Sequence, residues 1–81
     1  MRSVSRWVRA YDAHGNDLVI EWRIPDSVGL KYLQSVFGVK HEDPMYECFP
    51  VSSAQAEAIE RLIGTRLETA EYDYFLEADA E

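Results

Sequence analysis

The chain has 81 residues, of which 47% are hydrophobic, and a formal net charge of −7. This length allows one domain, and we expect residues 1–81 to form a single compact domain. The negative charge opposes contact with nucleic acid and membrane headgroups, and no run of 18 apolar residues could cross a membrane, so neither is expected as a partner.

Two half-buried strands are predicted over residues 3–11 and 18–24, because apolar and polar residues alternate there with the period of two that a strand requires. The second strand would place one set of apolar side chains on a single face: Leu18, Ile20, Trp22 and Ile24. Residues 13–17 between the strands include Gly15 and Asn16, which tolerate a positive φ. We therefore expect a β-hairpin.

A first helix is predicted over residues 27–37, with Asp26 capping its N-terminus and Gly38 just past its end. Its apolar side chains recur with helical spacing: Leu30, Leu33, Val36 and Phe37. The connection that follows holds Pro44 and Pro50. Residues 45–49 within it would add one short strand at an edge of the sheet, where proline is tolerated.

A second helix is predicted to begin after Ser52, which forms a capping box with Gln55, and to end at Gly64. Residues 66–78 fit either a strand or a helix, and the three aromatic residues within positions 72–75 favour the strand. The resulting order is strand, strand, helix, possible strand, helix, strand. It predicts an α+β fold in which two helices pack on one face of a small antiparallel sheet of three to four strands.

Five segments of the chain, in this order, carry a resemblance to a known family: Trp7–Asp12, Phe37–Val39, Asp43–Val51, Gln55–Ala56 and Tyr72–Glu77. They are similar to segments of small acidic bacterial proteins that are known only as a domain of unknown function. The resemblance spans most of the chain and implies a compact domain, but it brings no established activity and no catalytic residues. By its size and charge the chain also resembles the immunity proteins of bacterial toxin systems.

Acidic residues are concentrated in the second half of the chain. Residues 1–40 hold six basic and four acidic side chains, a net charge of +2, whereas residues 41–81 hold two basic and eleven acidic side chains, a net charge of −9. If residues 66–78 form a strand, its acids would project from the sheet face that the helices leave open, and acids of the preceding loop would extend the patch. The candidate partner-binding residues are Glu42, Asp43, Tyr46, Glu47, Glu71, Asp73, Phe75 and Glu77. Acids around aromatic anchors suit the docking of a cationic protein surface, although a face that only keeps the domain soluble has the same composition.

The sequence offers little for catalysis or metal binding. Cys48 and His41 are the only pair that suggests a nucleophile, but the acids around Cys48 would raise the pKa of its thiol, so a buried structural cysteine is expected. The spacing of the potential ligands within residues 41–47 matches neither a zinc site nor a calcium loop. We therefore expect no catalytic residue, no metal and no cofactor.

The single cysteine cannot form an internal disulfide, and arginines interrupt the apolar residues near the N-terminus, so a cytoplasmic location is expected. A nucleic-acid site on the first two strands would use these residues: Arg2, Arg6, Trp7, Arg9, Tyr11 and Arg23. The net charge opposes it, and we expect the arginines to pair with the domain's own acids.

These observations favour a non-enzymatic binding protein. The leading hypothesis is an immunity protein that neutralises a cognate bacterial toxin, of the nuclease class, by covering its basic active-site surface with an acidic, aromatic-containing face. The alternative is an accessory or self-assembling structural domain without a toxin partner, in which the strand at residues 45–49 or the surface near Phe75 forms a homodimer.

Overall fold

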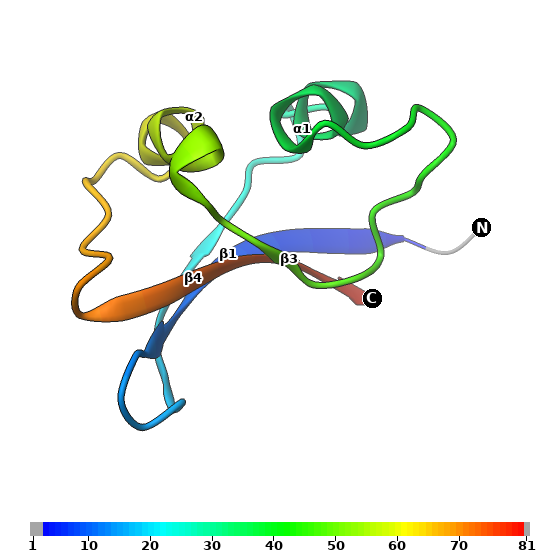
Figure 1. Cartoon of the computed structure of the whole chain (residues 1–81). Helices are drawn as coiled ribbons and strands as arrows, with labels where there is room; N and C mark the ends of the chain where they lie inside the picture. Colours follow the sequence, from blue (N-terminus) through cyan, green and yellow to red (C-terminus); the bar gives the residue numbers. More distant parts are fainter. Residues whose placement is uncertain (1–2, 81) are drawn as a thin grey trace.

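The computed structural model of the chain describes residues 3–80 and confirms the α+β fold. Its elements are β1 (Val4–Asp12), β2 (Leu18–Arg23), α1 (Leu30–Phe37), β3 (Phe49–Pro50), α2 (Ser53–Ile63) and β4 (Tyr72–Ala80). The strands form one antiparallel sheet of four strands in the order β2-β1-β4-β3. Both helices lie on the same side of this sheet (Figure 1).

The core lies between the sheet and the helices. On β1 it takes Val8 and Ala10, both fully buried, and on β4 it takes Tyr74 and Leu76. Because side chains alternate along a strand, the residues between these positions must point to the opposite face of the sheet. Ile24, just past β2, also belongs to the core, and the helices and the loop between α1 and β3 contribute Leu33, Met45 and Ile59.

The hairpin between β1 and β2 is confirmed, but a β-bulge changes one of its predicted faces. Asn16 has a φ of 63°, as the turn requires. The register pairs Ala10 with Ile20 but the next residue, Tyr11, with Leu18, so β2 carries one extra residue at this point. Cross-strand partners share a face, which places Leu18 with Tyr11 on the face opposite Ile20. The prediction that Leu18 shares one face with Ile20, Trp22 and Ile24 was therefore wrong.

The two helices end as predicted, whereas α1 begins later than predicted. Gly38 and Gly64 are the left-handed residues just past the helix ends, with φ values of 64° and 74°. At the start of α2, the Ser52 backbone N–H donates a hydrogen bond of 2.9 Å to the Gln55 side chain, as the capping box requires. Asp26 does not cap α1, because residues 25–28 form a separate turn in which the Val28 N–H donates to the Pro25 carbonyl.

The predicted edge strand at residues 45–49 was placed wrongly. Met45 is 1% exposed and has a φ of 54°, so the chain turns inward there, and β3 consists only of Phe49 and Pro50. Two side chains hold this loop. The Arg6 guanidinium donates to the carbonyl oxygens of Met45 and Pro44 at 2.8 and 2.9 Å. The buried Gln34 amide donates to the carbonyl oxygens of His41 and Asp43 at 2.9 and 2.7 Å.

The last segment is a strand, as the aromatic residues indicated, but it begins later than the predicted range of residues 66–78. Residues 66–71 form a loop and a turn, and β4 begins at Tyr72. β4 lies inside the sheet and pairs with β1 over nine positions, from Val4–Ala80 to Asp12–Tyr72. Neither helix described within residues 3–80 has the length and apolar character needed to span a bilayer.

Candidate functional site

The face of the sheet opposite the helices is covered by no helix or strand within residues 3–80 (Figure 1). The alternation of β1, β2 and β4 places side chains there, among them Ser5 and Leu18, and we call the nine charged and aromatic side chains on this side the open face. It consists of Trp7, Arg9, Tyr11, Glu21, Arg23, Asp73, Phe75, Glu77 and Asp79. With four carboxylates and two guanidinium groups, the open face carries a formal net charge of −2.

Arg9 holds three of these carboxylates together at the centre of the face. Its guanidinium contacts Glu21 at 2.8 Å, Glu77 at 2.9 Å and Asp79 at 2.6 Å, and we call these four residues the Arg9 cluster. The cluster joins β1 to both of its neighbours, β2 and β4. The Arg9 side chain is only 13% exposed, so these contacts are shielded from water more than ordinary surface ion pairs are.

Aromatic side chains surround the cluster. The Tyr11 hydroxyl donates a hydrogen bond of 2.7 Å to Glu77, and the Tyr11 ring meets the Phe75 ring edge to face at 5.7 Å. The Arg9 guanidinium lies 5.2 Å from the centre of the Trp7 ring. Rings fixed in this way offer apolar area to a partner at little additional entropic cost.

The cluster keeps its carboxylates ionised. The bond with Arg9 holds the pKa of Asp79 below its usual range. Burial disfavours the ionised form of Glu77, but hydrogen bonds from Tyr11 and Arg9 outweigh it and hold the pKa of Glu77 below its usual range. Hydrogen bonding to Asp79 raises the pKa of Arg9, and the bond to Glu77 raises the pKa of Tyr11 to about 12. Ionised carboxylates of this kind accept hydrogen bonds from cationic groups and are poor proton donors.

We expect the stability of the domain to depend on Glu77 in acid. Because folding lowers the pKa of Glu77, its contribution is complete above the unfolded value of about 4.3 and is lost as the pH falls through the lower folded value. Glu77→Gln should therefore show a smaller loss of stability than the wild type as the pH falls below about 4.3. Urea unfolding at a series of pH values measures this difference. If the free energy of unfolding falls equally steeply with pH in the two proteins, Glu77 does not contribute to the acid dependence of stability. Glu57→Gln, at an exposed side chain, serves as the control.

The structure brings together three of the predicted partner-binding residues. Asp73, Phe75 and Glu77 alternate with the buried residues of β4 and share the open face. Glu71 lies in the turn before β4 rather than on the strand, and its backbone carbonyl accepts a hydrogen bond from the Ala13 N–H. Asp73 and Glu71 are both exposed, and no cation within residues 3–80 lies at ion-pair distance from either.

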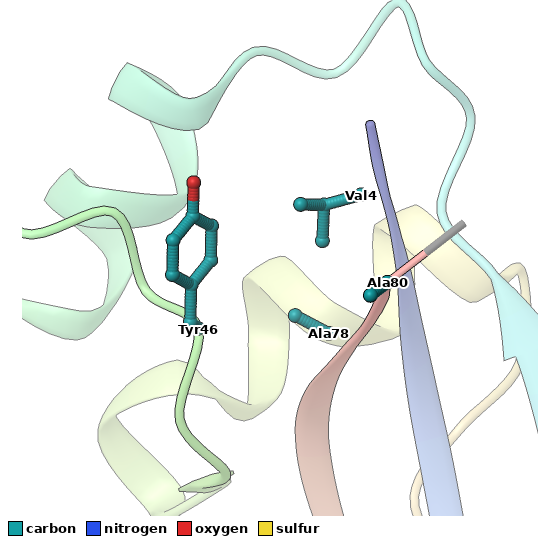
Figure 2. Close-up of a pocket in the computed structure, with 4 residues that line it drawn as sticks. All are labelled: Val4, Tyr46, Ala78 and Ala80. Carbon is teal, nitrogen blue, oxygen red and sulfur yellow. The ribbon is translucent and has the colours of Figure 1, made fainter. Parts of the chain in front are cut away.

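The loop residues of the predicted site do not extend the open face as one patch. Tyr46 lies on the helix side of the sheet, where it faces Val4, Ala78 and Ala80 across a hollow of about 170 Å³ (Figure 2). The Asp43 carboxylate accepts a hydrogen bond of 2.8 Å from the Met45 N–H and so stabilises the loop.

The other two loop acids lie on the surface. Glu42 is exposed beside His41, at 3.4 Å, and Glu47 is exposed as well. They therefore add negative charge to the surface of the loop, outside the nine residues of the open face.

Cys48 differs from its prediction in one respect. It is exposed rather than buried, and its thiol lies 3.5 Å from a carboxylate oxygen of Glu77. Partial burial of the sulfur and the charge of Glu77 raise the pKa of Cys48, so the expected direction is confirmed although the responsible acid is a different one. His14 lies exposed in the hairpin turn. Within residues 3–80, no three side chains of His, Cys, Asp or Glu are grouped closely enough to hold a metal ion.

The arginines of the first two strands do not share one side. Arg9 pairs with acids of its own chain, as expected, and Arg23 contacts Asp26 at 3.4 Å. Arg6 points to the opposite face and binds backbone carbonyls of the loop. Arg2 lies outside the described residues. The basic residues are therefore divided between two faces and do not form one groove.

Several residues of the open face were not among the partner-binding candidates from the sequence, although four of them were considered there for a nucleic-acid site. They are Trp7, Arg9, Tyr11, Glu21, Arg23 and Asp79. The alternation of β1 places Arg9 and Tyr11 opposite the buried Val8 and Ala10, which is a signal for this face. The pairing of β1 with β4, which brings Arg9 beside Glu77 and Asp79, connects positions about 70 residues apart and has no local signal.

No curated protein and no solved structure matches this chain. A family does match. The sequence profile of a domain of unknown function, DUF7683, covers residues 5–77, which include all four strands in whole or in part and both helices. The chain belongs to this family of domains of unknown function.

Proposed function

We propose that the chain is a non-enzymatic binding protein, the immunity protein of a bacterial toxin, which acts in the cytoplasm. Its target would be a nuclease whose active-site surface is basic because it binds phosphates. The chain would inhibit the nuclease by occlusion, with carboxylates of the open face occupying the positions of the phosphates. The observation that carries this proposal is the open face itself, on which acids and aromatic rings lie side by side without a covering element in residues 3–80.

The charges of the open face support a cationic partner. In the Arg9 cluster one guanidinium stands against three carboxylates, which leaves two negative charges to attract a partner. Asp73 adds a further exposed carboxylate on the same face, and Glu71 another in the adjoining turn. Electrostatic attraction of this kind speeds association and selects among partners.

The rigidity of the face supports binding rather than mere solubility. Arg9 and Tyr11 fix the Glu77 carboxylate through hydrogen bonds of 2.9 and 2.7 Å. Groups that are already ordered lose less conformational entropy when a partner docks, so more of the contact energy remains for affinity. Solubility requires charge but does not require carboxylates held in one geometry.

The test begins with the protein encoded immediately upstream of this chain. The two are co-expressed, complex formation is measured, and the nuclease activity of the upstream protein is compared with and without this chain. We expect a stable complex and loss of nuclease activity, with an association rate that falls steeply as salt is added. An upstream protein that is not a nuclease, or one whose activity is unchanged, would contradict the proposal.

Within such a complex, Asp73→Lys should weaken binding by about tenfold or more, because it places a cation where the proposal puts the contact with a cationic surface. The matched control is Glu68→Lys, which changes the net charge equally but alters an exposed side chain in the loop before β4. Isothermal titration calorimetry measures both affinities. Equal losses would mean that only the net charge matters and that the open face is not the contact surface.

A further inference from the structure

β2 is an unusual edge strand because it combines an open backbone edge with exposed apolar side chains. It lies at one end of the strand order, and no strand within residues 3–80 pairs with its outer side. Leu18, Val19 and Ile20 are 49%, 48% and 37% exposed. Proteins usually protect such edges with lysine, proline or a β-bulge. β2 contains no lysine or proline, and its bulge lies at the start of the strand, before the regular segment from Ile20 to Arg23.

The backbone of β2 is ready to pair with another strand. The Ile24 N–H, just past its end, donates to the Arg6 carbonyl of β1 at 2.8 Å. Backbone groups of an antiparallel strand point alternately to its two sides, so those of Trp22 also face β1 while those of Glu21 and Arg23 face outward. Two residues therefore offer both a donor and an acceptor at the free edge.

The side chains of Glu21 and Arg23 indicate which strand can bind at the free edge of β2. Glu21 and Arg23 lie two positions apart and on the same face, with opposite charges. Glu21 contacts Arg9 and Arg23 contacts Asp26, but their side chains are still 44% and 46% exposed and can accept a further contact. When two copies of β2 pair antiparallel about Trp22, Glu21 of each copy comes opposite Arg23 of the other. In this register the outward backbone groups of both copies also meet. A register shifted by one pair of positions would place Glu21 against Glu21, which is unfavourable.

From this self-complementarity we propose that the free edge of β2 binds a second copy of the same chain, giving a homodimer with a continuous sheet of eight strands. Ile20, which is 37% exposed, then lies in each copy beside the buried Ile24 of the other, which removes part of the Ile20 side chain from water. The other edge of the sheet is unsuited to this role, because β3 has two residues and one of them is Pro50. This inference is independent of the proposed function. Edge pairing uses Glu21 and Arg23 at the margin of the open face and leaves the β1 and β4 residues of both open faces uncovered.

The first test uses the wild-type protein. Sedimentation across a concentration series should show the mass rising from 9.3 kDa toward twice that value. In the dimer the amide hydrogens of Glu21 and Arg23 become hydrogen-bonded, so their exchange with solvent should slow as the protein concentration rises. If the sedimentation mass stays that of a single chain up to a protein concentration of about 1 mM, the proposal is overturned. A dimer in which these two amides exchange at the same rate as in the monomer would overturn it equally.

The second test uses charge reversal. In Arg23→Glu the opposed pairs become acid against acid, and in Glu21→Arg they become base against base, so each variant alone should be a monomer. Mixing equal amounts of the two restores opposite charges at both pairs, and the dimer should return. The register is contradicted if either variant alone forms a dimer at a protein concentration at which the wild type does. It is also contradicted if two folded variants do not associate when mixed. Circular dichroism checks that each variant is folded. If one variant is unfolded, the amide-exchange measurement on the wild-type protein still tests the proposal.

Discussion

Replacing Arg9 by leucine is expected to lower the free energy of unfolding by about 2 kcal/mol, which corresponds to a fall in Tm of roughly 10 °C for a domain of this size. The reason is that Arg9 holds Glu21, Glu77 and Asp79 together at distances of 2.6 to 2.9 Å. Without the guanidinium, three carboxylates remain close together at the junction of β1 with its two neighbours, where they repel one another. Thermal and urea unfolding of the variant and the wild type measure the loss.

Two further variants separate the causes of this effect. Arg9→Lys keeps the charge but cannot contact all three carboxylates with one planar group, so we expect a smaller loss than for leucine. Arg61→Ala removes an exposed ion pair with Glu57 on α2 and should cost less than about 1 kcal/mol. If Arg9→Leu is no more destabilising than Arg61→Ala, the Arg9 cluster does not stabilise the sheet.

Gln34→Glu is expected to have a larger effect, a loss of about 3 kcal/mol. Gln34 is 4% exposed, and its amide donates to the carbonyl oxygens of His41 and Asp43. A carboxylate of the same shape would direct oxygen atoms at these carbonyls, so two hydrogen bonds are lost and a charge is buried without a partner. The loop that carries the buried Met45 would then lose one of its two attachments.

The control for this variant is Ser35→Ala on the same helix. The Ser35 hydroxyl is exposed and donates only to the carbonyl of Tyr32 within its own turn, so its loss should be small. Urea unfolding compares the two variants. An unfolding free energy for Gln34→Glu near that of the wild type would show that the loop does not depend on this side chain. Titration of the variant should also restore stability at low pH, because protonation of the new carboxyl removes the buried charge.

The Arg9 cluster shows that the acids of the open face differ in how available they are to a partner. From the sequence, Glu77 was one of several acids available to a partner, whereas in the structure it is bound to Arg9 and Tyr11. A charge reversal at Glu77 would therefore destabilise the fold and weaken binding at once. Asp73 is exposed on the same strand and can report on binding alone, which is why the proposed test uses it.

The local features of the fold could be predicted because each depends on residues close together in the sequence. The capping box of Ser52 and Gln55 sets the start of α2, and Gly38 supplies the left-handed residue that ends α1. The alternation of β1 separates its buried side from the side of Arg9 and Tyr11. The prediction that Asp26 caps α1 was wrong, because residues 25–28 form a turn and the helix therefore begins only after it.

The amino-acid sequence by itself determined the two helices, the hairpin and the faces of β1, since hydrogen bonds between near neighbours and the period of the apolar residues decide these features. Only the tertiary structure decided which acids lie together. β4 pairs with β1 in a register that brings Glu77 and Asp79 to Arg9, while Tyr46 goes to the other side of the sheet. The register follows from packing the buried residues of β4 and β1 against the same helices, and that depends on contacts between residues far apart in the chain.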